Sequence, residues 1–172
     1  LVRWCDVMVG DYNHWFDVGA HWHALAQDQD WRVALLVDEA HSFGVFGEHG
    51  LGLCEELGIL AEVDFIVGTF SKSLGGVGGF CVSPHQELDL LRMASRPYIF
   101  TAAPAPAVIA AVHAALARVL EGKDLRERLW RHANRFHAAL LRLGYQVGSG
   151  TPGPVAALIF GERETAIGHW QG

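Results

Sequence analysis

Lys72 lies in a loop of small and hydroxyl-bearing residues, at positions 68–75, directly after an apolar segment. Its amine can form a Schiff base with an aldehyde, and the nearby hydroxyl and backbone N–H groups can hold a phosphate. Asp38 and His41 follow an earlier apolar segment. A carboxylate placed there can keep a pyridine nitrogen protonated, so that the ring accepts electrons. Together these residue types predict a site for pyridoxal phosphate, with Lys72 as the nucleophile.

Each residue of this set also has an ordinary structural explanation when it is taken alone. An aspartate after a strand is common, and a histidine or lysine in a loop is usually solvated. The combination is much rarer than its parts. Thr69, Ser71 and Ser73 surround Lys72 with hydroxyls, and the glycines within positions 75–79 permit close backbone approach. We therefore interpret the set as functional.

Residues 38–41 read Asp-Glu-Ala-His, which is also the magnesium-binding box of helicase-type ATPases. That alternative requires a phosphate loop of the form GxxxxGK[ST] earlier in the chain. The sequence contains no such loop, and its formal net charge of -6 is unfavourable for binding to nucleic acid or to an anionic membrane. The ATPase reading therefore stays a minor alternative, which tight ATP binding without binding of a carbonyl cofactor would revive.

The opening segment contains His14, His21 and His23, which raise a metal hypothesis. His21 and His23 could share one face of a strand, but no third ligand lies at a recognisable interval from them, so we predict no metal site. The three cysteines are odd in number and widely spaced, which argues against a disulfide framework or zinc ribbon and favours a reducing cytosol. No apolar run approaches the roughly 20 residues of a membrane-spanning helix, and the start lacks the pattern of a signal peptide. We therefore expect a cytoplasmic protein.

Apolar runs and helical periodicities alternate along the chain from residue 31 onward. The run at 33–37 is expected to be a central parallel strand, covered on both faces. Strands that alternate with helices imply an α/β layer built on a largely parallel sheet. Further strands are predicted at 64–68, 78–83 and 155–160, an extended segment at 96–101, and helices at 54–60, 84–93, 107–120, 124–143 and 162–170.

The helix predicted at 124–143 has clear boundary residues, with Asp124 as a plausible N-cap and Gly144 as the stop. Gly122 ends the helix before it. Cys81 is predicted to be a small core residue of its strand. The arginines at 126, 128, 131, 135 and 142 are expected to be solvated, opposite an apolar stripe formed by Leu125, Leu129, Phe136, Leu140 and Leu143.

Five blocks, taken in order, resemble the α-oxoamine synthase family of pyridoxal-phosphate enzymes, which has the aspartate-aminotransferase type of fold (fold type I). Within the family they are most similar to the sphingolipid branch, the bacterial serine palmitoyltransferases. Residues 1–30 are an atypical segment, rich in tryptophan and histidine and without a clear period. The resemblance implies part of the large cofactor-binding domain at 31–122, and a connecting helix with the start of the C-terminal domain at 123–172. The blocks are Val-Asp-Glu-Ala-His-Ser at 37–42, Phe-Gly-Glu-His-Gly-Leu-Gly at 46–52, Gly-Thr-Phe-Ser-Lys-Ser at 68–73, Val-Gly-Gly-Phe at 77–80 and Arg-Pro-Tyr-Ile-Phe-Thr at 96–101.

The resemblance also implies a role for each candidate residue. Lys72 would carry the cofactor as a Schiff base and exchange protons at the substrate α-carbon. Asp38 would pair with the pyridinium nitrogen, and His41 would hydrogen-bond the phenolic oxygen of the cofactor. Thr69 and Ser71 would bind its phosphate.

Thr101 matches the position that reaches the phosphate of a neighbouring subunit, so the resemblance implies a homodimer with shared sites. The implied reaction condenses an amino acid, expected to be L-serine, with an acyl-CoA, expected to be palmitoyl-CoA. It releases carbon dioxide and belongs to sphingolipid-base biosynthesis. Small-molecule substrates are therefore the expected partners, with no nucleic acid and no transmembrane segment.

The sequence also departs from the family pattern. An upstream residue that stacks on the pyridine ring, an upstream phosphate-binding helix and a downstream arginine for the substrate carboxylate are not identifiable. We therefore expect weak cofactor binding and little turnover for the chain in isolation. Two alternatives stay open: another α-oxoamine synthase that condenses glycine or alanine, and a catalytically silent partner subunit.

Overall fold

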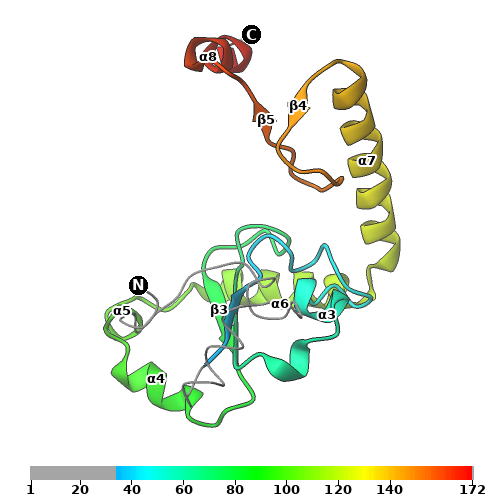
Figure 1. Ribbon diagram of the computed structural model, residues 1–172. Helices are drawn as coiled ribbons and strands as arrows, with labels where there is room; N and C mark the ends of the chain where they lie inside the picture. Colours follow the sequence, from blue (N-terminus) through cyan, green and yellow to red (C-terminus); the bar gives the residue numbers. More distant parts are fainter. Residues whose placement is uncertain (1–33, 172) are drawn as a thin grey trace, which may run out of the picture.

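The computed structural model describes residues 34–171 (Figure 1). The predictions for residues 1–30 and for the histidines at 14, 21 and 23 lie outside this range. Within it the elements follow the order β1 (Leu36–Asp38), α3 (Leu53–Glu56), the 3-10 turn η2 (Leu60–Glu62), β2 (Phe65–Thr69), β3 (Gly79–Val82), α4 (Leu88–Ala94), α5 (Arg96–Ile99), α6 (Pro106–Glu121), α7 (Lys123–Arg142), β4 (Gln146–Val147), β5 (Leu158–Ile159) and α8 (Arg163–Gln171).

The first three strands form one sheet in the order β1-β2-β3. β1 and β2 are parallel, with Asp38 opposite Val67, as the α/β prediction requires. β3 is antiparallel to β2, with Thr69 opposite Gly79, so the sheet is mixed. The loop between β2 and β3 is too short for the crossover that a parallel pair needs. The chain therefore turns straight back.

The core lies between the sheet and α6, where Phe43, Leu74 and Val112 are buried together. Phe80 on β3 contacts this cluster, with its ring centroid 5.2 Å from that of Phe43. Side chains alternate between the two faces of a strand, so Cys81 points away from the core and is exposed. The prediction of Cys81 as a core residue is therefore wrong.

The opposite face of the sheet is less covered than the sequence predicts. The apolar run that contains β1 was expected to be buried on both faces, but Leu36 in this run is 62% exposed. α6 packs on the face that carries Phe80 (Figure 1). The exposed face of β1 and β3 has no equivalent layer among the described residues. The strand prediction is right, and the prediction of burial on both faces is wrong.

The segment after β3 contains two short helices. The helix predicted from residue 84 begins later, at Leu88. Residues 96–101 were expected to be extended, but Arg96–Ile99 forms a one-turn helix. Pro97 occupies the first helical turn, where a proline costs no hydrogen bond, and Ser95 before it is extended. The segment expected to be extended thus contains a helix that begins at Arg96.

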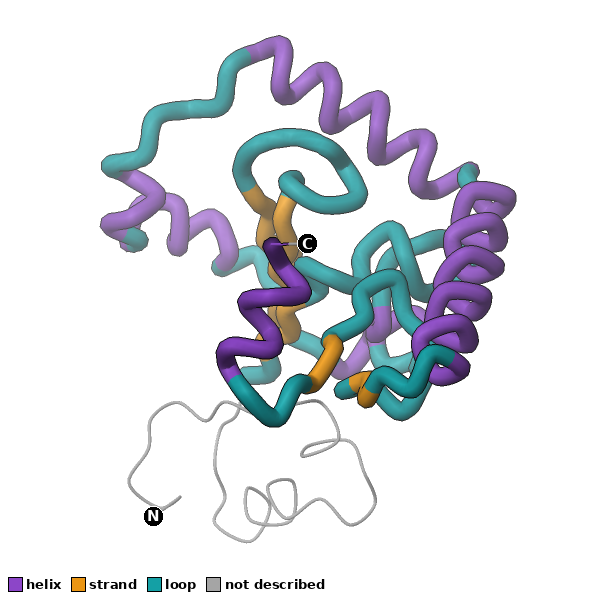
Figure 2. Tube along the Cα trace, turned by 90° about the horizontal axis from the view of Figure 1, so that it is seen from above, coloured by secondary structure: helices purple, strands orange, loops and turns teal. Residues whose placement is uncertain are grey.

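Gly122 separates the two long helices, α6 and α7, which run in different directions in Figure 2. A side chain at Gly122 would collide with the carbonyl oxygen of Arg118, so the tight junction requires glycine. Gly122, and not Asp124, is the N-cap of α7, because the helix begins one residue earlier than predicted. Gly144, with a φ of 81°, follows the end of α7 as expected.

The buried face of α7 differs from the predicted stripe. Arg126, expected to be solvated, is only 8% exposed, whereas Phe136 and Leu143 are largely exposed. The guanidinium of Arg126 donates to the carbonyl oxygens of Val119 and Glu48, which compensates its burial. The residues that α7 buries are Arg126, Ala133, His137 and Leu140.

The C-terminal part lies at the far end of α7 from the sheet (Figure 1). β4 and β5 pair antiparallel, and α8 follows. Tyr145, Phe160 and His169 pack their rings together there, with the Phe160 and His169 centroids 4.6 Å apart. Among the helices of residues 34–171, none has the length and apolar character needed to cross a membrane.

Candidate active site

The carboxyl ends of β1 and β2 place the candidate residues on one edge of the sheet. Asp38 ends β1 and pairs with Val67 of the parallel strand β2, whose last residue is Thr69. Lys72 follows in the loop after β2. In open α/β sheets the carboxyl ends of strands are where ligands bind. The alternating apolar and turn segments thus bring Asp38 and the lysine loop to the same edge.

Lys72 and His41 are joined directly. The amine nitrogen Nζ lies 2.8 Å from the imidazole Nε2, although the two residues are 31 positions apart. Both side chains are exposed. With an ammonium as the donor, Nε2 is the acceptor and the imidazole carries its own proton on Nδ1. The contact fixes the loop after β1 against the loop after β2.

The hydroxyl groups of Thr69 and Ser71 form a pair beside Lys72. Their oxygens are 2.8 Å apart, and the backbone N–H of Ser71 donates to the hydroxyl of Thr69 over 3.2 Å. The Thr69 hydroxyl in turn donates to the carbonyl oxygen of Gly78. Two hydroxyls and the surrounding loop amides make a donor group of the kind that binds a phosphate.

Asp38 lies at the same sheet edge as Lys72 and the two hydroxyls, whereas Thr101 follows α5. The carboxylate of Asp38 is exposed, and its Oδ1 accepts the N–H of Ala40 over 2.8 Å, which starts the turn that leads to His41. Thr101 is exposed after α5, and its hydroxyl donates to the carbonyl oxygen of Pro97 within its own turn. The structure therefore gathers five of the six candidate positions at one edge, and among the described residues no hydrogen bond joins the Thr101 side chain to them.

Glu39 is a residue of the site region that the sequence reasoning missed. Its side chain is fully buried, and its carboxylate accepts the backbone N–H of Leu53 over 2.8 Å and that of Cys54 over 2.7 Å. The hydroxyl of Ser42 also donates to it. A Cβ on Gly52 would lie 2.6 Å from the Glu39 carboxyl carbon, so only glycine fits there. Glu39 thus anchors α3 to the turn that carries His41.

The only sequence signal for Glu39 was its position next to Asp38, because the two backbone N–H groups that it accepts are 14 and 15 residues away. The buried carboxylate also affects Cys54. Desolvation, with added contributions from the hydrogen bond and charge of Glu39, raises the pKa of the Cys54 thiol to about 12. Cys54 is therefore an inert core thiol at neutral pH.

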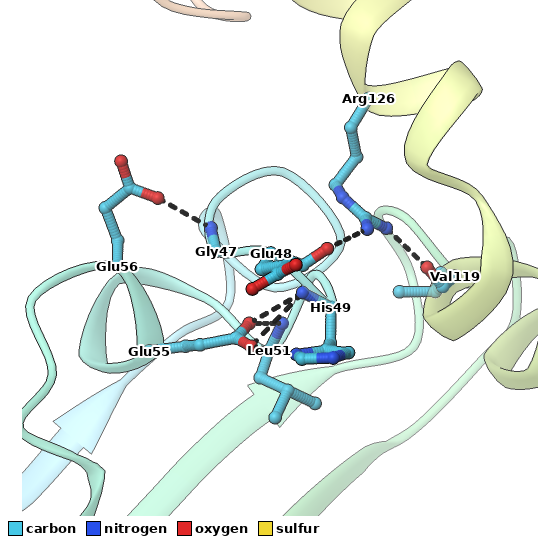
Figure 3. A network of polar contacts seen from close by, with 8 residues as sticks. All are labelled: Gly47, Glu48, His49, Leu51, Glu55, Glu56, Val119 and Arg126. Atoms are coloured by element: carbon cyan, nitrogen blue, oxygen red, sulfur yellow. Dashed lines mark hydrogen bonds and ion pairs between the residues drawn. The ribbon is translucent and has the colours of Figure 1, made fainter.

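The glycine-rich loop at 43–52 is held from the α3 side by two carboxylates (Figure 3). Glu55 accepts the backbone N–H groups of His49 and Leu51, and its Oε1 lies 2.6 Å from the His49 ring Nδ1. Glu56 accepts the N–H of Gly47 over 3.0 Å. Partial burial opposes ionisation of Glu55, but the hydrogen bonds from Leu51 and His49 outweigh it and hold its pKa below the ordinary value.

The other side of the same loop is held by α7. Arg126 donates to the carbonyl oxygen of Glu48, and the Trp130 indole N–H donates to that of Val45 over 3.1 Å. At Gly44 a Cβ would lie only 2.5 Å from the Cβ of Ser73, so the loop packs closely on the lysine loop. The loop at 43–52 therefore links the connecting helix to the neighbourhood of Lys72.

The chemistry of these groups fits pyridoxal phosphate. An amine, an imidazole, a carboxylate and paired hydroxyls share one sheet edge, as the cofactor's aldehyde, phenolic oxygen, ring nitrogen and phosphate require. A cavity of about 580 Å³ opens beside Lys72 and His41. Among residues 34–171 no cluster of histidine, cysteine and acidic side chains could hold a metal ion.

Comparison with known proteins gives the same family throughout. Residues 19–168 match the family described as aminotransferase class I and II. A serine palmitoyltransferase of Caulobacter vibrioides is 45% identical over 166 residues, which cover 96% of this chain and 41% of that protein. An 8-amino-7-oxononanoate synthase of Petrotoga mobilis is 36% identical over 142 residues, covering 82% of this chain and 35% of that protein.

Solved structures agree. The serine palmitoyltransferase of S. paucimobilis with a bound PLP-myriocin aldimine superposes with a TM-score of 0.80 at 40% identity, covering 86% of this chain and 38% of that one. The Sphingomonas wittichii serine palmitoyltransferase superposes with a TM-score of 0.78 at 42% identity, covering 87% of this chain and 37% of that one. The chain thus spans about two fifths of the length of the relatives that it matches.

Proposed function

The chain belongs to the aminotransferase class I and II family, and from that premise we propose that it carries the reactive lysine and part of the cofactor cradle of a pyridoxal-phosphate-dependent acyltransferase. The reaction condenses L-serine with palmitoyl-CoA, releases carbon dioxide and supplies a sphingolipid base. The observation that carries the proposal is the 2.8 Å contact of Lys72 with His41, at the sheet edge that also holds Asp38.

In this proposal the cofactor, when bound, supplies an aldehyde for amines and a ring that accepts electrons from the substrate α-carbon. The Lys72 amine binds the aldehyde and later removes and returns a proton at that carbon. Asp38 holds a proton on the ring nitrogen, and His41 donates to the phenolic oxygen. Both imidazole and amine are exposed and adjacent, so substrate can reach them.

The phosphate has a matching place in the same proposal. The hydroxyls of Thr69 and Ser71, whose oxygens are 2.8 Å apart, and the amides of their loop donate to it, and the Thr69 hydroxyl gives up its bond to the carbonyl oxygen of Gly78. Thr101 binds the phosphate in a second copy of the chain, which makes the enzyme a homodimer with shared sites. Its exposure is compatible with that role. We place the protein in the cytoplasm.

The division into domains follows the same reasoning. Residues 31–122 form part of the large domain, and residues 123–172 form the connecting helix and the start of the C-terminal domain. Gly122 supports this boundary, because it is the junction between α6 and α7.

The test combines cofactor absorbance with product formation. The chain is loaded with pyridoxal phosphate, titrated with serine, glycine and alanine in turn, and then given palmitoyl-CoA while free CoA thiol is measured. When the chain is mixed with a complete homologue, the proposal predicts a spectral shift and CoA release above those of the homologue alone, with serine in preference to the other two. A response to glycine or alanine alone contradicts the choice of serine, and a mixture that releases no more CoA than the homologue alone contradicts the activity.

A second candidate is another α-oxoamine synthase that condenses glycine or alanine. It is supported by the relative named 8-amino-7-oxononanoate synthase, at 36% identity. A silent partner subunit is the third possibility that the sequence leaves open. Coexpression with a complete homologue, followed by a pulldown and an activity measurement, separates a catalytic chain from a silent one.

A further inference from the structure

Arg126 on α7 is only 8% exposed, and two of its nitrogens donate hydrogen bonds within the protein. One donates to the carbonyl oxygen of Val119, near the end of α6, and the other donates to that of Glu48 in the loop at 43–52 (Figure 3). Burial of a guanidinium costs free energy, and an apolar side chain of similar size would avoid that cost. Because the guanidinium is planar and rigid, it fixes the two carbonyl groups relative to each other. Core packing alone therefore does not explain a charge at this position.

Arg126 also holds the same loop by close packing, together with a second residue of α7. A Cβ on Gly50 would lie 3.0 Å from a terminal nitrogen of Arg126, so the backbone of the loop lies directly on the guanidinium. The indole N–H of Trp130 donates to the carbonyl oxygen of Val45 over 3.1 Å, and its ring centroid lies 5.1 Å from that of Phe46. Residues four apart share one helix face. One face of α7 thus holds the loop at several points.

The loop is also adjacent to both members of the Lys72–His41 contact. It begins two residues after His41, and its first residue, Phe43, is buried in the core. At Gly44 a Cβ would lie 2.5 Å from the Cβ of Ser73, the neighbour of Lys72, so no free space separates the two loops. Because protein interiors are close-packed, a shift of one loop is transmitted to the other. The position of the loop therefore affects both reactive side chains.

We propose that Arg126 is a positioning residue, which acts through the loop at 43–52 to keep the Lys72 amine and the His41 imidazole in contact. The inference rests on the proposed function, in which these two groups meet the cofactor, and it adds a residue outside the site that controls their geometry. The 2.8 Å contact joins two exposed side chains that are 31 positions apart, so it depends on the backbone beneath them. Because Arg126 belongs to α7, the site also becomes sensitive to the orientation of that helix.

The test determines the tautomer of the His41 imidazole. A hydrogen bond from the Lys72 ammonium to Nε2 places the ring proton of His41 on Nδ1. The histidines are labelled with ¹⁵N, and their ring nitrogens are observed by NMR at about pH 8, above the ordinary histidine pKa of about 6.5. The sequence contains ten histidines, so the His41 signals are assigned as those missing in His41→Asn. His137, which α7 buries, is the internal reference for the packing of that helix.

Two variants weaken the contacts of α7 with the loop. Arg126→Met removes both donors and keeps the length of the side chain, whereas Trp130→Phe removes one hydrogen bond and keeps an aromatic ring. Arg128→Met is the matched control, because it makes the same change at an exposed position on the same helix. We expect the Nδ1–H signature of His41 to be lost in the first variant, weakened in the second and kept in the control. The signals of His137 should stay unchanged in all three.

An unchanged His41 tautomer in both Arg126→Met and Trp130→Phe overturns the proposal. If Arg126→Met also changes the signals of His137, the helix itself has moved, and Trp130→Phe decides alone. In that variant a weakened His41 signature with a normal His137 supports the proposal, and a normal His41 signature overturns it.

The rate of cofactor labelling separates this inference from the proposed function. A misplacement on the order of 1 Å at a reacting group can slow a reaction on the order of a hundredfold. We therefore expect pyridoxal phosphate and borohydride to label Lys72 at least about tenfold more slowly in Arg126→Met and at the normal rate in Arg128→Met. A normal rate in Arg126→Met contradicts the positioning role. Absence of a label on Lys72 in the unmodified chain contradicts the proposed function, whereas the His41 signals still test the effect of Arg126 on the contact.

Discussion

Replacing Glu39 by glutamine tests whether this buried carboxylate holds the site region together. The change keeps the size of the side chain but replaces one acceptor oxygen by an NH₂ group. That group then faces a backbone N–H of Leu53 or Cys54, both of which now donate to the carboxylate over 2.7–2.8 Å. A hydrogen bond to a charged group contributes about 1.5–3 kcal/mol, and a buried N–H left without an acceptor costs about 1–3 kcal/mol.

Both figures include the loss of the same hydrogen bond, so they do not add in full. We therefore expect Glu39→Gln to lower the free energy of unfolding by about 2–4 kcal/mol. The measurement is a urea titration followed by far-ultraviolet circular dichroism, with the midpoint and slope fitted together. Glu62→Gln, at an exposed position at the end of η2, is the matched control and should change the midpoint little. A loss below about 0.5 kcal/mol for Glu39→Gln, equal to an ordinary surface change, would refute the reasoning.

Three further predictions concern the same region. Gly44→Ala places a methyl group 2.5 Å from the Cβ of Ser73 at a φ of 82°, so we expect it to lower stability by about 1 kcal/mol or more in the same titration. The pKa of Glu55 is lowered in the folded state, so its stabilising contribution is present above its ordinary value of 4.5 and is lost as the pH falls through the lower folded pKa. Glu55→Gln should therefore flatten the acid side of the stability profile, and an unchanged profile contradicts this. Iodoacetamide at pH 8 should modify exposed Cys81 but spare Cys54 until urea unfolds the chain, as peptide mapping will show, since burial raises the Cys54 pKa to about 12.

The elements with strong local signals were predictable from the sequence. Gly122 and Gly144 mark the helix ends that the structure has, because a Cβ at Gly122 would collide with the carbonyl oxygen of Arg118 and Gly144 has a φ of 81°. The strands at Leu36–Asp38 and Phe65–Thr69 follow from short apolar runs. The direction of β3 did not follow from composition, although the short connection to it should have indicated an antiparallel pair.

Burial at single positions depended on partners far away in the sequence. Arg126 is buried because carbonyl oxygens of Glu48 and Val119 accept its donors, and no helical periodicity reveals that arrangement. Glu39 is buried for the same kind of reason. By contrast, the shared sheet edge of Asp38, His41 and Lys72 could be predicted, because each lies at the carboxyl end of a strand or in the loop that follows it.

The most direct test of the account is the position of the cofactor label. The sequence contains only two lysines, Lys72 and Lys123, so each serves as the control for the other. The chain is incubated with pyridoxal phosphate, reduced with borohydride, digested and mapped by mass spectrometry. The account predicts a label on Lys72 that is absent in Lys72→Ala and unaffected in Lys123→Ala. Equal labelling of both lysines, or none in the folded chain, contradicts it.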